Sequence, residues 1–146
     1  MKTSALAIDH GARRTGFAAT DALRIATRPL EVFEGAGDGT ELVERVAELT
    51  AEREVKTLVV GLPVNMDGSE GPRAREVRAF VERLRARLPE VAIDLQDERL
   101  STKVAEELQR DAGVPASRRR AVRDSWSALV ILRDWIDGGE EGSGRE

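Results

Sequence analysis

Three segments of this chain combine an apolar run with a carboxylate, and the first of them, residues 4–11, constrains the fold most. Residues 4–8 are almost all apolar, which is the pattern of a strand buried on both faces, and the run stops at Asp9. A charged group at the end of a buried strand is costly unless it is paired or bound to a metal. We therefore expect Asp9 to meet a partner from elsewhere in the chain. A basic, glycine-flanked turn and a second apolar run over 12–21 predict a hairpin beside this strand.

The rest of the chain predicts a mixed sheet covered by helices. Residues 23–33, interrupted by Pro29, suit a third strand that lies at an edge or carries a bulge. Asp38 and Glu41 have the spacing of a capping box, which predicts that a helix starts at Asp38. Apolar periodicity predicts further helices over 72–88, 101–111 and 116–137, and further strands over 56–63 and 91–98.

These elements predict an α/β fold in the order β-β-β-α-β-α-β-α-α. A strand that is reached through a helix is by default parallel to the strand before it. The expected architecture is therefore a mixed five-stranded sheet with helices on both faces. The chain of 146 residues shows no internal repeat, so we expect one domain over 1–137 and a disordered tail, rich in glycine and glutamate, over 138–146.

Composition limits the kinds of site that the chain can build. It has no cysteine and one histidine, which excludes thiolate and imidazole-rich metal sites, so any metal must be held by oxygen. The net charge of −4 gives no overall attraction to nucleic acid, although arginines cluster locally. The sequence has no signal-peptide pattern and no apolar run of about 18 residues, so we expect a soluble, cytoplasmic protein without membrane contact.

The candidate catalytic and metal-binding residues are Asp9, Glu98 and Asp124. Asp9 and Glu98 end predicted strands, and sites in open sheets form beyond the carboxyl ends of parallel strands. Asp124 shares a predicted helix face with apolar residues, although a solvated surface position is the alternative interpretation. Three such carboxylates would repel one another unless a divalent cation kept them ionised, and their oxygen ligands indicate Mg²⁺ or Mn²⁺. A site of this kind suits hydrolysis of a phosphodiester.

Four segments follow one another along the chain: AIDHG with RRTG at 7–16, VVGLPVNMDG at 59–68, DERLST at 97–102, and RDS at 123–125 before ALVIL at 128–132. Together they resemble the YqgF family, which is described as Holliday junction resolvases and as the nuclease that matures the 5′ end of pre-16S ribosomal RNA. The resemblance spans residues 4–137 and implies an RNase H-like fold with catalytic acids at Asp9, Glu98 and Asp124. Two details depart from the commonest pattern, His10 after the first acid and Ser-Trp-Ser over 125–127.

Several polar residues near these segments are candidates for substrate binding. Arginines can hold phosphates or form ion pairs within the protein, and the sequence favours neither. Asn65 can contact the substrate backbone or form a turn in which Gly68 takes a positive φ. His10 could shuttle a proton, but a lone exposed histidine is more often incidental. The candidates are Arg13, Arg14, Asn65, Arg99, Arg119, Arg120 and Arg123.

The resemblance leaves two substrates open, a ribosomal RNA precursor, which could lie within a pre-ribosomal particle, and a branched DNA junction. Paired cleavage of a junction needs a symmetric dimer, and the sequence offers no clear dimer surface, so we expect a monomer or weak homodimer. A sugar-kinase or actin-like ATPase could use residues 9–16 as a phosphate loop, but it needs a second domain to close on its nucleotide. A nucleic-acid binder without catalysis is disfavoured because all three acids are present.

Overall fold

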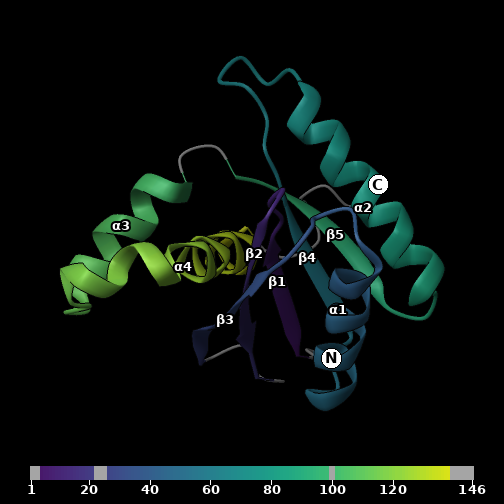
Figure 1. Ribbon diagram of the computed structural model, residues 1–146, viewed down its shortest axis with the longest axis horizontal. Helices are drawn as coiled ribbons and strands as arrows, with labels where there is room; N and C mark the ends of the chain where they lie inside the picture. Colours follow the sequence, from purple (N-terminus) through teal and green to yellow (C-terminus); the bar gives the residue numbers. More distant parts are fainter. Residues whose placement is uncertain (1–3, 22–25, 99–100, 139–146) are drawn as a thin grey trace.

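The computed structural model describes residues 4–21, 26–98 and 101–138, and its elements follow the predicted order (Figure 1). Each predicted strand and helix is found within a few residues of its expected bounds. The elements are β1 (Ala5–Asp9), β2 (Arg14–Thr20), β3 (Thr27–Glu34), α1 (Thr40–Glu52), β4 (Thr57–Leu62), α2 (Pro72–Arg87), β5 (Ala92–Asp97), α3 (Ser101–Asp111) and α4 (Ala116–Asp137).

The strands form one mixed sheet in the spatial order β3-β2-β1-β4-β5. The first three strands are antiparallel neighbours, whereas β1, β4 and β5 run parallel because helices connect them. The predicted edge position of the third strand is confirmed, and the pairing of β2 with β3 shifts register between Gly16 and Ala18. Residues 23–25 of the predicted third strand lie outside the described residues. The parallel strands carry their carboxyl ends to one edge of the sheet.

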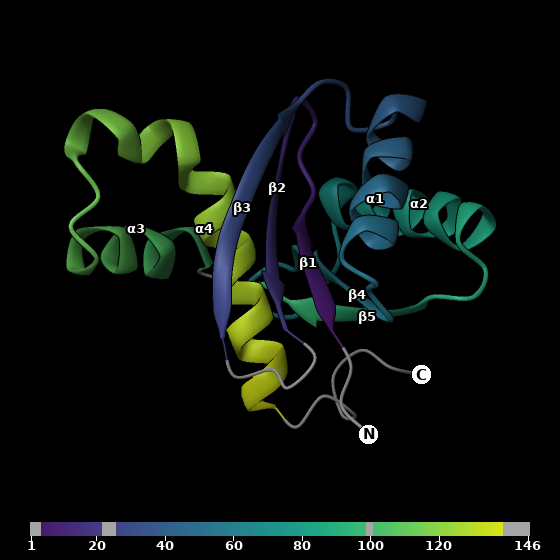
Figure 2. The same ribbon diagram turned by 90° about the horizontal axis from the view of Figure 1, so that it is seen from below.

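Alternation along the strands gives the sheet two apolar faces that bind different helices. On β1, Leu6 and Ile8 join the core beneath α1 and α2, whereas Ala5 and Ala7 join the core beneath α4. Figure 2 shows α4 on one side of the sheet and α1 with α2 on the other. The prediction of helices on both faces is confirmed. Because the α4 face of the central strands consists largely of small residues, α4 can approach the sheet closely.

A helical arm, defined here as α3 with residues 116–123 of α4, extends beyond the sheet (Figures 1 and 2). The Gln109 side chain, which is fully buried, donates from Nε2 to the carbonyl oxygen of Arg119 at 3.0 Å and ties the two helices together. The second half of α4 packs on the sheet through a buried apolar segment that ends at Trp135. One helix therefore joins the sheet to the arm.

The predicted helix start at Asp38 is wrong. The cap of α1 is Gly39, which has an extended backbone and no side-chain cap, and the Asp38 side chain lies exposed. The Gly39 amide donates to the carbonyl oxygen of Ala36 at 3.3 Å, so a turn in the backbone takes the place of the expected carboxylate cap.

At the other end of the chain, α4 ends at Asp137 as predicted. Apart from Gly138, the predicted tail lies outside the described residues. Within the residues that the structure describes, no helix is both long enough and apolar enough to cross a membrane.

Candidate active site

Asp9 and Glu98 lie at the carboxyl edge of the sheet, on the face that α4 covers. Asp9 is the last residue of β1 and follows Ala5 and Ala7 on the same face by strand alternation. Glu98 follows β5 directly, and its backbone amide donates to the carbonyl oxygen of Leu62 at 3.2 Å, which continues the pairing with β4. The two acids therefore flank the end of β4.

The two carboxyl groups are close enough to share a side-chain hydrogen bond, which needs one proton between them. Burial raises the pKa of Asp9 well above its usual range, and the nearby charges of Glu98 and Asp124 raise the pKa further. The Arg73 guanidinium acts in the opposite direction but does not compensate. Burial and the two neighbouring carboxylates therefore favour the protonated form of Asp9.

The position of Asp124 depends on Gly16, which is paired with Asp9 across β1 and β2. A Cβ at Gly16 would lie 2.1 Å from the carbonyl carbon and oxygen of Asp124. Only a residue without a side chain allows the α4 backbone to come this close. The predicted shared face of Asp124, Ala128, Ile131 and Trp135 is confirmed, since the other three residues are fully buried against the sheet and Asp124 is half-buried.

A second glycine, Gly61 on β4, makes room for Glu98. A Cβ at Gly61 would lie 2.8 Å from Oε1 of Glu98 and 2.5 Å from Cδ1 of Ile131. Gly61 was not among the residues predicted for the site. The available signal was a glycine inside an otherwise apolar strand, which often marks a close approach by another group.

Arg14 bridges the sheet to α4. Its Nε donates to Oδ2 of Asp124 at 2.8 Å, and its Nη2 donates to the carbonyl oxygen of Ala121 at 2.7 Å. The Asp124 side chain is 25% exposed and the Arg14 side chain 37% exposed, so the ion pair is only partly screened by water. Of the two roles that the sequence left open for this arginine, phosphate contact and internal ion pairing, the geometry favours the second.

The expectation that His10 is exposed is wrong, because the residue is only 6% exposed. Its Nε2 lies 2.8 Å from the carbonyl oxygen of Gly37, and its Nδ1 lies 3.3 Å from Nη2 of Arg73. These contacts indicate the tautomer in which Nε2 donates to Gly37 and Nδ1 accepts from Arg73. Burial lowers the pKa of His10, which favours this neutral form. Strand alternation directs His10 to the face opposite Asp9.

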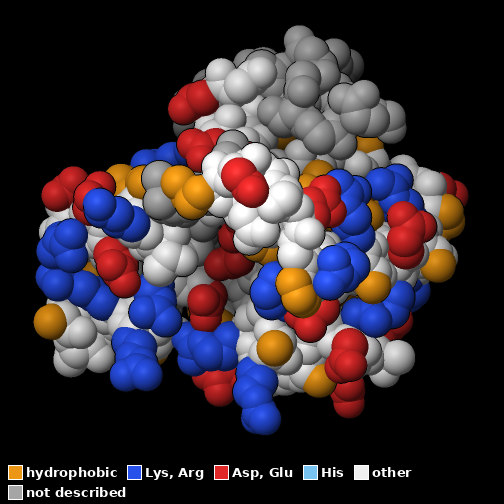
Figure 3. Space-filling model, turned by 90° about the horizontal axis from the view of Figure 1, so that it is seen from above, with side chains coloured by type: hydrophobic (Ala, Val, Ile, Leu, Met, Phe, Trp, Pro, Cys, Tyr) orange, Lys and Arg blue, Asp and Glu red, His pale blue; other side chains and the backbone are white. Residues whose placement is uncertain are grey.

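The arginines that precede Asp124 lie on the helical arm. Arg119, Arg120 and Arg123, together with Arg110 and Glu106, line a hollow of about 420 Å³ between α3 and α4. Figure 3, which looks onto the carboxyl edge of the sheet, shows acidic side chains in a central hollow and basic side chains gathered on the arm. Arg119 also makes a contact within the arm, because its Nε donates to the carbonyl oxygen of Val114 at 2.9 Å.

The remaining predicted substrate residues are dispersed. Arg13 is exposed in the turn after β1, and Arg99 lies outside the described residues. Asn65 is exposed in the loop between β4 and α2, where its Nδ2 donates to Oγ of Ser69 at 2.9 Å. Gly68 has a φ of 89°, which confirms the predicted turn.

No group of three or more histidine, aspartate or glutamate side chains among the described residues is arranged to hold a metal ion as it stands. Asp9 and Glu98 contact each other, but Asp124 contacts Arg14 instead. The three acids thus lie in two parts, a carboxyl pair formed by Asp9 and Glu98 and a third carboxylate, Asp124, that is paired with Arg14.

A family model described as RuvX, Holliday junction resolvase, matches residues 3–138. The chain belongs to this family. A curated protein of Anaeromyxobacter sp. (strain Fw109-5) named "Putative pre-16S rRNA nuclease" is 46% identical, and the match covers 91% of this chain and 96% of the relative. A protein of the same name from Nocardia farcinica is 40% identical over 90% of this chain and 76% of its own length. The YqgF resemblance is therefore confirmed, and the family is one of nucleases.

Solved structures confirm the RNase H-like fold. RuvC of T. thermophilus, in complex with a Holliday junction substrate, has a TM-score of 0.62 and 15% identity, covering 94% of this chain and 96% of its own. The fowlpox virus Holliday junction resolvase has a TM-score of 0.60 and 7% identity, covering 93% and 99%. At such low identity, the likeness to these structures shows only that the RuvX family member shares their fold.

Proposed function

We propose that this protein is a metal-dependent endonuclease that hydrolyses a phosphodiester bond during 5′-end maturation of pre-16S ribosomal RNA, in the cytoplasm. The observation that carries the proposal is the contact between Asp9 and Glu98 at the carboxyl edge of the sheet, with Asp124 near enough for its charge to raise the pKa of Asp9. The names of the family's curated relatives support the RNA substrate.

The residues at this edge fit a divalent cation. The donors are carboxylate oxygens, which suit Mg²⁺ or Mn²⁺. The pKa of Asp9 is raised by burial and then by the charges of Glu98 and Asp124, and a cation would relieve that repulsion. Asp9 and Glu98 would hold the ion as a pair, and Asp124 would complete the set while Arg14 keeps its carboxylate in place. When bound, the ion supplies an activated water and neutralises charge on the phosphate.

The protein's own groups would position the reactants. Asp9 and Glu98 are fixed by the ends of two strands, and Asp124 is fixed by the close approach of α4 to Gly16. Arg14 would act as a positioning residue, because it holds Asp124 and the Ala121 carbonyl at once. Arginines on the helical arm would hold substrate phosphates at a distance from the cleaved bond.

Arg14→Met is expected to lower kcat at least tenfold while changing the affinity for RNA by less than about threefold. The variant keeps the side-chain stem but loses both contacts to α4, so Asp124 is no longer held in place. The melting temperature should fall, since a half-exposed ion pair of this kind contributes up to about 1 kcal/mol. Single-turnover cleavage and thermal unfolding measure the two effects.

Arg13→Met is the matched control, because Arg13 is the exposed residue immediately before Arg14, in the turn that leads into β2. It should leave the melting temperature unchanged. If Arg14→Met instead weakens RNA binding and lowers its salt dependence while kcat is preserved, then Arg14 is a phosphate contact and not a positioning residue.

Arg120→Glu is expected to weaken RNA binding at low salt and to make its salt dependence shallower by roughly one unit of log-log slope. Arg120 is exposed and lines the hollow of the helical arm, so the change reverses a charge without removing a buried contact. Binding should be measured in chelator over a series of salt concentrations.

Arg28→Glu makes the same charge change at the other end of the sheet. Arg28 is exposed and pairs with Ala19, which in turn pairs with Leu6 near the start of β1. Its effect on affinity should be much smaller. Equal effects of the two variants would mean that the protein attracts RNA through its overall charge and that the arm is not the binding surface.

A branched DNA junction is the second candidate substrate, because the matching family model is described as a Holliday junction resolvase. The two candidates can be compared directly by incubating the protein with a labelled pre-16S RNA fragment and with a synthetic four-way junction, each with Mg²⁺ or Mn²⁺. We expect cleavage of the RNA near the mature 5′ end, with one subunit sufficient for the reaction. Symmetric, paired nicking of the junction without RNA cleavage would favour the resolvase.

A further inference from the structure

We propose that a pocket on the opposite side of the sheet edge from Asp9 binds one unstacked nucleobase of the substrate, with guanine as the preferred base. We call it the His10 pocket. The proposal deepens the proposed nuclease function, since it assigns sequence preference to a second part of the same edge. The base would belong to a nucleotide that flanks the cleaved bond.

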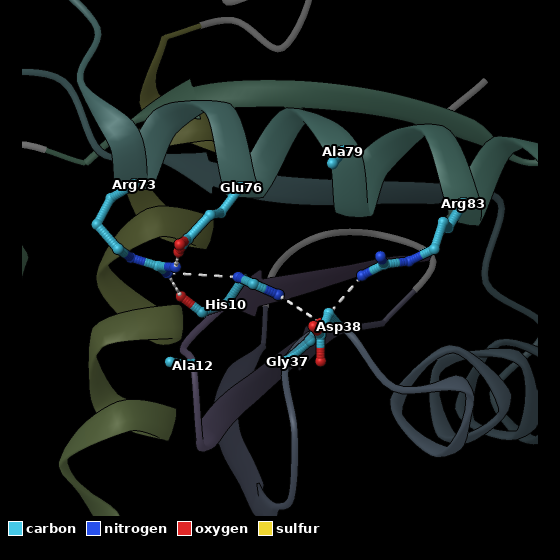
Figure 4. A pocket seen from close by; sticks show the side chains of 8 residues that line it. All are labelled: His10, Ala12, Gly37, Asp38, Arg73, Glu76, Ala79 and Arg83. Atoms are coloured by element: carbon cyan, nitrogen blue, oxygen red, sulfur yellow. Dashed lines mark hydrogen bonds and ion pairs between the residues drawn. The ribbon is translucent and has the colours of Figure 1, made fainter.

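The His10 pocket has a volume of about 220 Å³ and lies between the end of β1, the loop before α1 and one side of α2. Figure 4 shows His10 between Arg73 and Arg83, which reach toward it from opposite ends of α2. Ala12 and Ala79 contribute small apolar walls. The pocket therefore combines small apolar walls with charged groups at its ends, a lining that suits a nucleobase.

Arg83 provides an unused donor at one end of the pocket. Its Nη2 donates to the carbonyl oxygen of Gly37 at 3.1 Å, but its Nε is buried and has no hydrogen-bond partner among the described residues. The buried Nε cannot be reached from the pocket. Nη1 also has no hydrogen-bond partner among the described residues but is not buried, so Nη1 and Nη2 can together donate to acceptors on a bound ligand. The pocket thus selects for a ligand with an acceptor edge.

The other end of the pocket is arranged differently. Arg73 is occupied, because its Nη2 donates to the His10 carbonyl oxygen at 2.6 Å and its Nη1 is paired with Glu76. The Glu76 carboxylate also lines the pocket and retains further acceptor capacity. A ligand can therefore receive a hydrogen bond at the Arg83 end and donate one at the Glu76 end.

Charge balance favours a base over a phosphate. The two arginines of the pocket are matched by Asp38 and Glu76, and both ring nitrogens of His10 are already in contact with Gly37 and Arg73. A phosphate would bring uncompensated negative charge, whereas a base is neutral and carries both donors and acceptors. Guanine fits best because its O6 and N7 are the usual acceptors for arginine, and its N1 and N2 groups can donate to a carboxylate.

The pocket is held in shape by contacts that are independent of substrate. His10 is bound through both ring nitrogens and lies on Phe80 with ring centroids 4.5 Å apart. A Cβ at Gly37 would lie 2.2 Å from the carbonyl oxygen of Gly11 and 2.9 Å from Nε2 of His10, so this contact requires a glycine. Because the walls are fixed before binding, the pocket is suited to discriminate between bases.

The proposal is tested by binding of fluorescent single-stranded RNA pentamers in chelator, with guanine replaced by adenine, cytosine, uracil or inosine at each position in turn. We expect guanine at one position to bind about tenfold more tightly than the other natural bases, which is the discrimination of one good bidentate contact. Inosine, which lacks the N2 amino group, should bind with intermediate affinity.

Two variants should remove this preference. Arg83→Met removes the donor, and Ala79→Phe fills the pocket from an exposed position on α2 without changing Arg83. In both, the guanine pentamer should bind no more tightly than the others. Arg85→Met is the control, because Arg85 is exposed on the same helix and is paired with Glu82, and it should keep the full preference.

Because binding is measured without metal, the result does not depend on cleavage. A guanine preference in a protein that fails to cleave RNA would support the pocket and contradict the proposed nuclease function. Equal binding of all pentamers, or no binding of any, would overturn the pocket even if the protein cleaves RNA. An equal loss of affinity for every pentamer in Arg83→Met would also overturn it, because Arg83 would then be a phosphate contact.

Discussion

Asp9→Asn is expected to lower the rate of RNA cleavage at least a thousandfold in Mg²⁺. Asparagine keeps the volume of aspartate and can donate to Glu98, but it removes a charge that a small, strongly hydrated cation requires. A thousandfold loss corresponds to about 4 kcal/mol of transition-state stabilisation. The affinity for RNA in chelator should change little, because the arginines on the arm remain. Single-turnover cleavage measures the rate.

The same variant should be more stable than the native protein at neutral pH in chelator. The pKa of Asp9 is raised by folding, so its contribution to stability is complete below the unfolded pKa of about 3.9 and is lost as the pH rises through the folded pKa. The asparagine side chain does not titrate, so Asp9→Asn should lose less stability over this range. If the variant cleaves RNA at a near-native rate in Mg²⁺, the proposed role of Asp9 is wrong.

Gly16→Ala is expected to impair both folding and cleavage. The new Cβ would lie 2.1 Å from the carbonyl carbon and oxygen of Asp124 and 2.4 Å from the amide nitrogen of Ser125, and these backbone atoms cannot rotate away. Either β2 or α4 must move. Overpacking of this kind typically costs about 1–3 kcal/mol, and a displacement of about 1 Å at Asp124 would slow cleavage about a hundredfold. Thermal unfolding and single-turnover cleavage measure the two losses.

Gly71→Ala is the matched control. The atoms nearest to a Cβ at Gly71 belong to the Asn65 side chain, at 3.9 Å or more, which is ordinary contact. Gly71 caps α2, so the change should cost up to about 1 kcal/mol and leave kcat unchanged. Equal effects of the two substitutions would mean that α4 does not press against β2 at Asp124.

Much of the fold could be predicted from the sequence because its elements follow strong local patterns. The uninterrupted apolar run of β1 and its stop at Asp9 indicated a buried strand with a polar end, and the apolar face of α4 around Asp124 indicated where that helix packs. The helix start at Asp38 could not be predicted, because Gly39 provides an extended cap and the backbone turn leaves the Asp38 side chain outside.

The internal contacts of the site were less predictable because they join residues far apart in the chain. Arg14 and Asp124 are 110 residues apart in the sequence. Neither local segment contains a pattern that distinguishes an arginine that binds α4 from one that binds phosphate. Burial of His10 depends on Gly37 and Arg73, which come from two other elements. Gly61 is informative only when Glu98 and Ile131 are known to lie over it.

The most direct test of the proposed metal-dependent site is to locate Mn²⁺ by anomalous diffraction in crystals of the native protein and of Asp9→Asn. We predict a manganese peak bound by the carboxylate oxygens of Asp9 and Glu98 in the native protein, with Asp124 beside the ion and still paired with Arg14, and no peak at this position in Asp9→Asn. A native protein that cleaves RNA in Mn²⁺ while its crystals hold the ion elsewhere, or hold none at these carboxylates, would contradict the account.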